Sequence, residues 1–245
     1  MDDFGIETYG ERIADQYDEL YAQKLPPDTT VKFLADLVGD GRALELGIGT
    51  GRVAIPLAAL GVRVEGIDAS PAMVARLRAK AGGNDIPVHI GNFADVDVEG
   101  SYSLIYIPFN TFFALTSQTE QLRCMRNARA HLDVGGSFVI EGFVPDLARF
   151  RNNQCTTVTD VGVDSVTIDA SIHDPVSQTI STSHLVLTDG QTVRIYPVLL
   201  RYVWPAELDA MALASGLRLA ERFGDYEHGR FDASSTRHVS VYRPA

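Results

Sequence analysis

The sequence predicts an α/β fold: a doubly wound, mainly parallel sheet of seven strands, with an antiparallel β insertion after the fifth strand. A short apolar strand at 43–46 runs directly into a glycine-rich loop and a helical pattern. Strand and helix patterns then alternate along the chain, which is typical of a parallel sheet. Residues 156–203 switch to a period of two, which indicates three or four antiparallel strands. The seven strands are expected at 43–46, 62–67, 87–90, 103–107, 137–143, 217–223 and 238–242.

Length, composition and charge limit the class of protein. The chain has 245 residues, of which 45% are hydrophobic, and this suits one globular unit that carries an insertion. The net charge of −11 and the absence of a Lys/Arg-rich run argue against a nucleic-acid partner. The start of the chain lacks a secretory pattern, and no apolar stretch approaches the ~18 residues of a membrane span. Cys124 and Cys155 form no C-x-x-C pair, so we expect both thiols to be free. Together these features predict a cytoplasmic protein without membrane contact.

The first residues form a tyrosine-rich helical pattern over 8–24 that Pro26 and Pro27 end. An aromatic stripe of this kind either packs on the core or forms a lid over a ligand site. The insertion is expected to supply walls of a substrate pocket or a contact in a homodimer. The expected parts are therefore an N-terminal helical lid (1–40), a ligand-binding core (41–150), the antiparallel insertion (151–203) and the last helix and two strands of the core (204–245).

The glycine-rich loop contains Gly47, Gly49 and Gly51. Glycine tolerates positive φ and lets a ligand lie against the backbone, while the helix that follows directs free N–H groups to the same place. A dinucleotide fingerprint, G-x-G-x-x-G, would need its third glycine where Arg52 stands, and no G-x-x-x-x-G-K-[ST] pattern is present. Pro56 lies within the following helix, where we expect a bend.

Glu45 and the three glycines form the pattern E-x-G-x-G-x-G, which resembles motif I of the class I S-adenosylmethionine-dependent methyltransferases. The resemblance covers roughly 40–143 and the last two strands, but not the insertion. It implies a Rossmann-like fold, S-adenosylmethionine as cofactor and S-adenosylhomocysteine as product. In that family the acid, here Glu45, lies near the methionine end of the cofactor, and a Tyr-rich N-terminal helix covers the cleft.

Asp68 ends the second strand, and its distance from the glycine loop fits the acid that binds ribose hydroxyls in nucleotide folds. The resemblance places Asn92 and Phe93 beside the adenine, although a plain turn is the alternative. The cofactor-binding residues that we expect are Tyr17, Tyr21, Glu45, Gly47, Ile48, Gly49, Gly51, Asp68, Ala69, Met73, Asn92, Phe93 and Ile107.

The segment after the fourth strand should emerge where the methyl group leaves. Its order, Ile-Pro-Phe-Asn, is not the (D/N)-P-P-(Y/F) motif of nucleic-acid amino-methyltransferases. Asn110 is a candidate for orienting the acceptor, with capping of the next helix as the alternative. Candidate bases are Glu141, His173 and His184. No metal-ligand spacing is present, so we expect metal-independent transfer.

The architecture resembles the sugar-amine N-methyltransferases and the glycine N-methyltransferase-like enzymes. The resemblance therefore implies methyl transfer to a nitrogen or oxygen of a small molecule, either a secondary metabolite or its sugar precursor. Two other classes stay open: a non-catalytic module that binds S-adenosylmethionine, and an NAD(P)-dependent enzyme, which Arg52 disfavours.

Overall fold

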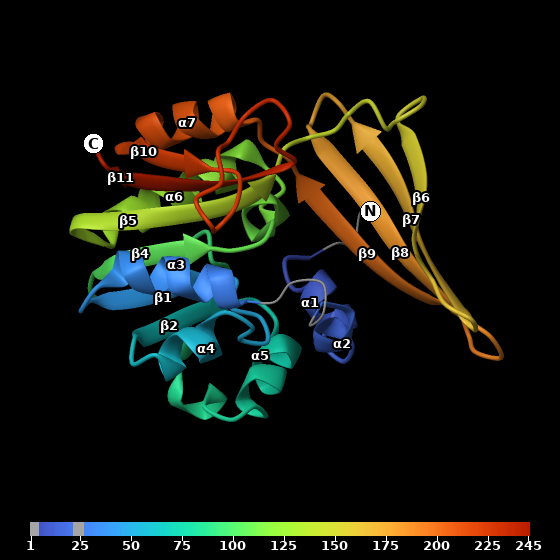
Figure 1. The fold of residues 1–245 in the computed structure, drawn as a ribbon, viewed down its shortest axis with the longest axis horizontal. Helices are drawn as coiled ribbons and strands as arrows, with labels where there is room; N and C mark the ends of the chain where they lie inside the picture. Colours follow the sequence, from blue (N-terminus) through green and yellow to red (C-terminus); the bar gives the residue numbers. More distant parts are fainter. Residues whose placement is uncertain (1–4, 22–26) are drawn as a thin grey trace.

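The structure is a computed structural model that describes residues 5–21 and 27–245. Within these ranges the chain forms a seven-stranded sheet A, in the order β10-β11-β5-β4-β1-β2-β3, and a four-stranded sheet B, in the order β6-β7-β8-β9 (Figure 1). Strand β11 runs antiparallel to both its neighbours, and the other pairs of sheet A are parallel. Sheet B is antiparallel throughout and follows β5 in the chain. The predicted fold class is confirmed.

The strands of sheet A are β1 (Arg42–Leu46), β2 (Arg63–Asp68), β3 (Val88–Ile90), β4 (Tyr102–Ile107), β5 (Leu132–Phe143), β10 (Leu217–Phe223) and β11 (Arg237–Pro244). Those of sheet B are β6 (Gln154–Val161), β7 (Ser165–Asp174), β8 (Thr179–Thr188) and β9 (Arg194–Arg201). Central strands such as β1 and β4 are buried almost throughout, because helices cover both faces of sheet A.

One face of sheet A is covered by α3 (Asp28–Val38), α4 (Ala54–Ala59) and α5 (Pro71–Arg78), and the other by α6 (Gln118–Ala130) and α7 (Pro205–Ala214). Two single turns, η1 (Gly83–Asp85) and η2 (Thr111–Ala114), complete the core. Successive residues along each strand point to opposite faces of the sheet, so each of the two layers has its own hydrophobic cluster. No described helix is long and apolar enough to cross a membrane.

The single helix predicted over 8–24 is wrong. The described residues form α1 (Thr8–Ile13) and α2 (Tyr17–Tyr21), and residues 22–24 lie outside the described ranges. A tight turn separates the two helices, with the Gln16 N–H donating to the Ile13 carbonyl. The Gln16 side chain accepts a hydrogen bond of 2.7 Å from the Tyr196 hydroxyl of β9. A contact from a segment far along the chain therefore stabilises the turn.

Two other local expectations change. Pro56 is the third residue of α4, where the backbone nitrogen would have no partner within the helix, so proline removes no bond there. Strand β5 begins at Leu132 rather than at 137 and runs through Gly135 and Gly136, a pair that is typical of a turn. Leu132 pairs with Tyr102 of β4 and regular pairing resumes at Ser137, so both glycines lie at an irregularity of the ladder that local glycine preference cannot anticipate.

Sheet B stands beside the carboxyl ends of the sheet A strands, and α1 and α2 lie between the two sheets (Figure 1). Its strand β9 contacts α1, which in turn contacts α5. Parallel sheets of this type bind ligands at the carboxyl ends of their strands. The described part of the insertion therefore forms one side of the region where a ligand is expected.

Candidate active site

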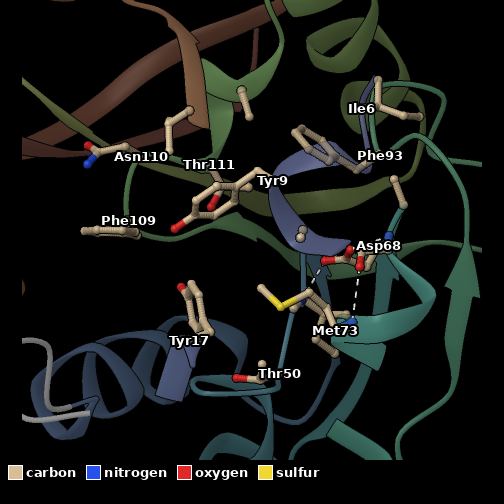
Figure 2. Close-up of a pocket in the computed structure, with 18 of the residues that line it drawn as sticks. Ile6, Tyr9, Tyr17, Thr50, Asp68, Met73, Phe93, Phe109, Asn110 and Thr111 are labelled. Atoms are coloured by element: carbon tan, nitrogen blue, oxygen red, sulfur yellow. Dashed lines mark hydrogen bonds between the residues drawn. The ribbon is translucent and has the colours of Figure 1, made fainter. Parts of the chain in front are cut away.

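A cavity of about 330 Å³ lies at the carboxyl ends of β1, β2 and β4 (Figure 2). Its floor is the glycine loop after β1 and the start of α5. Its walls are the segment after β4, the helices α1 and α2, and parts of β8 and β9. The cavity is therefore bounded by sheet A, the N-terminal helices and sheet B together.

The three loop glycines have positive φ but different roles. A Cβ on Gly47 would stand 2.4 Å from the Thr111 Cγ2 methyl, so glycine there lets the segment after β4 approach the loop. A Cβ on Gly51 would meet Ile55 and Leu77 at 3.0 Å, so this glycine serves the packing of α4 against α5. Gly47 and Gly49 line the cavity, and Gly51 is not among the lining residues.

Asp68 ties the glycine loop to α5. Its Oδ2 accepts a hydrogen bond from the Gly49 N–H at 2.7 Å, and its Oδ1 accepts one from the Ser70 N–H at 2.8 Å (Figure 2). Burial raises the pKa of Asp68, and the backbone donors at Ser70 and Gly49 oppose that rise. The backbone N–H of Ala69 also contributes, and the two carboxylate oxygens together still have acceptor capacity of the kind that a ribose diol needs.

Glu45 is a buried carboxyl group at the base of the cavity. It accepts a hydrogen bond of 2.8 Å from the Tyr106 hydroxyl. Burial raises the pKa of Glu45 to about 8, so the group is largely protonated at neutral pH without a ligand. A cation bound beside it would favour the ionised form, which suits the ammonium or sulfonium of the cofactor.

Three tyrosines of the N-terminal helices line the cavity. The hydroxyls of Tyr9 and Tyr21 lie 3.2 Å apart, and the rings of Tyr17 and Tyr21 are 4.8 Å apart between centroids. Tyr21 also meets the Phe109 ring edge to face. Burial raises the pKa of Tyr17 to about 12, so these hydroxyls act as neutral donors and acceptors around physiological pH.

Polar contacts dock both N-terminal helices on the glycine loop and on α5. Glu11 of α1 accepts a hydrogen bond of 2.7 Å from the Ser70 hydroxyl at the start of α5. Asp18 of α2 accepts one of 2.7 Å from the Thr50 hydroxyl and forms an ion pair of 2.7 Å with Lys80. The helices therefore contact the residues that shape the cavity floor.

The segment after β4 is bound to the end of β5. Phe109 has a φ of +61°, uncommon for a residue other than glycine, and its N–H donates to Glu141 at 2.6 Å. Glu141 also accepts a hydrogen bond of 3.0 Å from the Tyr226 hydroxyl. In return, Asn110 Oδ1 accepts one of 2.9 Å from the Phe143 N–H. Asn110 lines the cavity, and its side chain does not cap the following turn, because Phe143 engages its oxygen.

The two histidines of the insertion have different surroundings. His184 lines the cavity, and its Nδ1 lies 2.6 Å from Asp169 Oδ1 on the neighbouring strand. His173 is buried, with its Nε2 3.0 Å from the Tyr202 hydroxyl and its ring against Phe150. It is not among the residues that line the cavity.

Most of the residues expected from the sequence meet at this cavity: Tyr17, Tyr21, Glu45, Gly47, Ile48, Gly49, Asp68, Ala69, Met73, Phe93, Asn110 and His184. Five do not line it: Gly51, Asn92, Ile107, Glu141 and His173. The Asn92 side chain accepts from the Ala94 N–H instead, and Ile107 lies in the core. In the described part of the chain, no three His, Cys, Asp or Glu side chains gather in a way that could hold a metal ion.

Sequence reasoning missed several lining residues. Thr50 carries a hydroxyl group at the cavity, and Leu200 comes from β9. The position of Thr50 within the glycine-rich loop could have indicated it. Thr111, which the sequence places beside Asn110, and Tyr9 of the tyrosine-rich pattern also line the cavity. Nothing in the local pattern singles out Asp169, because its pairing with His184 depends on strand register.

Known proteins resemble this chain in sequence and in fold. A family model described as "Methyltransferase domain" matches residues 43–136. The CcbJ methyltransferase from Streptomyces caelestis is 44% identical, with a TM-score of 0.93, covering 99% of this chain and 100% of that one. The cypemycin N-terminal methyltransferase from a Streptomyces species is 26% identical over 96% of both chains.

A further structure shares the fold. The sugar N-methyltransferase KedS8 from Streptoalloteichus sp ATCC 53650 has a TM-score of 0.66 and 20% identity, covering 92% of each chain. The matches extend over sheet B as well as sheet A, since nearly the whole chain is covered.

Proposed function

The chain belongs to the S-adenosylmethionine-dependent methyltransferases, and we propose that it transfers the cofactor's methyl group to a nitrogen or oxygen of a small molecule, a secondary metabolite or its sugar precursor. The proposal rests on one observation: a single cavity is lined both by residues that suit the cofactor and by residues that suit an acceptor. Asp68 and the glycine loop suit the nucleoside, and Asn110 and His184 stand on the walls where an acceptor would lie.

The residues at the floor would bind the cofactor. Asp68 would accept hydrogen bonds from the ribose hydroxyls, and Glu45 would face the charged methionine end. Phe93 would pack on the adenine from the segment after β3, and the tyrosines of α1 and α2 would cover the cleft. The cofactor supplies a methyl group activated by a positively charged sulfur.

The chain's contribution to the reaction would be mainly positioning, which can supply about 7–11 kcal/mol when the reacting atoms are held in line. The acceptor's lone pair forms the new bond to the methyl carbon as the carbon–sulfur bond breaks, and S-adenosylhomocysteine leaves. For an amine, the departing proton needs an acceptor. His184 is the best-placed candidate, because Asp169 orients its ring through Nδ1 and leaves Nε2 for the proton.

A nitrogen acceptor has more support than an oxygen acceptor. The names of two similar proteins specify N-methylation, of an N-terminus in one and of a sugar in the other. A neutral amine also attacks without a strong base, and His184 is a proton acceptor that lines the cavity. Glu141 is a poorer candidate base. Its carboxylate already accepts hydrogen bonds from the Phe109 N–H and the Tyr226 hydroxyl, and it does not line the cavity.

The test is turnover of S-adenosylmethionine to S-adenosylhomocysteine with a library of small amines, alcohols and phenols. We expect amines to be methylated, and we expect His184→Gln to lower kcat while leaving cofactor affinity within about two-fold. Binding of S-adenosylhomocysteine without turnover of any library member would favour the non-catalytic module. Binding of NADH in place of S-adenosylhomocysteine, by calorimetry, would contradict the proposal altogether.

A further inference from the structure

A second cavity, of about 230 Å³, lies on one face of sheet B. It shares His184, Val198 and Leu200 with the first cavity, so the two spaces meet at those side chains. Its other lining residues come from β6, β7, β8 and the segment before β6: Arg149, Thr157, Thr159, Asp169, Ser171 and Thr182.

The strand register accounts for this lining. Thr157 stands opposite Asp169, and Asp169 stands opposite His184, so the three share one face across β6, β7 and β8. In the next row Ser171 is opposite Thr182. The residue opposite His184 on β9 is Tyr196, which contacts the N-terminal segment through Gln16. The face that carries the second cavity is therefore the face turned toward the methyl-transfer site.

Hydroxyl groups dominate this surface. The Ser171 and Thr182 hydroxyls lie 2.9 Å apart, so one hydrogen is shared between them and the other hydroxyl hydrogen stays available for a ligand. The Asp169 carboxylate uses one oxygen toward His184 and can accept from a ligand hydroxyl with the other. Val198 and Leu200 add a small apolar area beside these groups.

On the basis of the proposed function, we propose that the second cavity binds the non-reacting part of the methyl acceptor, and that this part is polyhydroxylated, as a sugar ring is. Such a ring would exchange hydrogen bonds with the hydroxyls and Asp169 and place its C–H face on Val198 and Leu200. Its amine would then lie at the junction beside His184, within the first cavity.

An anionic occupant such as a phosphate fits the surface less well. Arg149 is the arginine among the lining residues, it is exposed, and its guanidinium lies over the Phe150 ring. Asp169 faces the same space, and the chain carries a net charge of −11. An apolar occupant would leave the Ser171, Thr182 and Asp169 polar atoms without ligand partners, which costs free energy.

The experiment uses the full chain loaded with S-adenosylhomocysteine and four probes. These are methyl glucosides in which an amine replaces the hydroxyl at carbon 2, 3, 4 or 6. Cyclohexylamine, a six-membered ring without hydroxyls, is the comparison ligand. Ligand-observed NMR titration gives each Kd. We expect at least one amino glucoside to bind at least ten-fold more tightly than cyclohexylamine.

The test variant is Thr157→Val with Thr182→Val, which keeps the side-chain shape and removes two hydroxyls. It should raise the Kd of that glucoside at least ten-fold and leave the Kd of cyclohexylamine within two-fold. The matched control is Thr156→Val, whose side chain lies on the opposite face of β6. It should leave both values unchanged, and the melting temperature of each variant reports on folding.

The inference is overturned if none of the four glucosides binds, or if the double variant binds them as the wild type does. Binding of inorganic pyrophosphate that Arg149→Gln abolishes would overturn it in favour of an anionic occupant. If S-adenosylhomocysteine itself does not bind, the proposed function fails first, and calorimetry of that step separates the two failures.

Discussion

Replacement of Asp68 by alanine tests the cofactor site most directly. The carboxylate holds the Gly49 and Ser70 N–H groups at 2.7 and 2.8 Å, and the proposed ribose bonds would use its remaining acceptor positions. The change should therefore affect both the loop and the ligand. Asp68→Asn is the informative second variant, since it keeps one acceptor oxygen and the side-chain volume.

The expected losses follow from hydrogen bonds to a charged group, which contribute about 1.5–3 kcal/mol each. Loss of the equivalent of one such bond to ribose corresponds to a rise in Kd of roughly 10- to 150-fold. Freeing the two backbone donors should also destabilise the fold by about 1–3 kcal/mol, because each loses its protein partner. For a domain of this size the melting temperature should fall by roughly 2–12 °C.

Isothermal titration calorimetry with S-adenosylhomocysteine measures the first effect, and thermal unfolding measures the second. Asp68→Asn should give smaller losses in both, because it retains one neutral acceptor. Asp36→Ala, at an exposed carboxylate on α3, is the control and should change neither quantity. An Asp68→Ala protein that folds and binds S-adenosylhomocysteine within two-fold of the wild type would refute the ribose assignment.

Three further outcomes are expected. Because burial raises the pKa of Glu45 to about 8, the ligand-free fold should lose stability as pH rises from about 4.5 toward 8, since the native state then binds more protons than the unfolded state. Chemical denaturation at several pH values should show this slope, and Glu45→Gln should flatten it; an equal slope in both proteins contradicts the assignment. Asn110→Ala should lower kcat/KM at least ten-fold, about 1.4 kcal/mol, with the Kd of the cofactor nearly unchanged. Unchanged turnover per folded molecule would show that Asn110 does not orient the acceptor. Gly47→Ala should destabilise the loop and weaken cofactor binding, because its Cβ would stand 2.4 Å from a Thr111 methyl. Removing that methyl with Thr111→Ser should restore part of the affinity, and calorimetry that finds no recovery would place the defect in the positive φ alone.

The part of the cavity that we assign to the cofactor was largely predictable from the sequence. Gly47, Gly49 and Asp68 lie within short stretches whose strand and helix flanks are clear from local pattern. In a parallel sheet, the ends of neighbouring strands meet at one edge, so a glycine loop and an acid on adjacent strands must come together.

The part that we assign to the acceptor was less predictable, because its residues are held by long-range contacts. From the sequence, Glu141 is expected to be an exposed acid at the end of a strand. In the structure it accepts hydrogen bonds from the Phe109 N–H and the Tyr226 hydroxyl. The two alternatives for Asn110 did not include the bond that its side chain makes to the Phe143 N–H. Each partner comes from another part of the chain.

By itself, the sequence determined the succession of strands along the chain, the glycine loop, the acid of the second strand and the two-residue period of the insertion. These features depend on neighbouring residues, whose backbone preferences and apolar spacing act locally. Tertiary structure alone decided that the N-terminal pattern splits into α1 and α2, and which face of sheet B meets the cavity. It also brought Asp169 to His184, because strand register sets that pair, and a shift of one residue would turn either side chain to the opposite face.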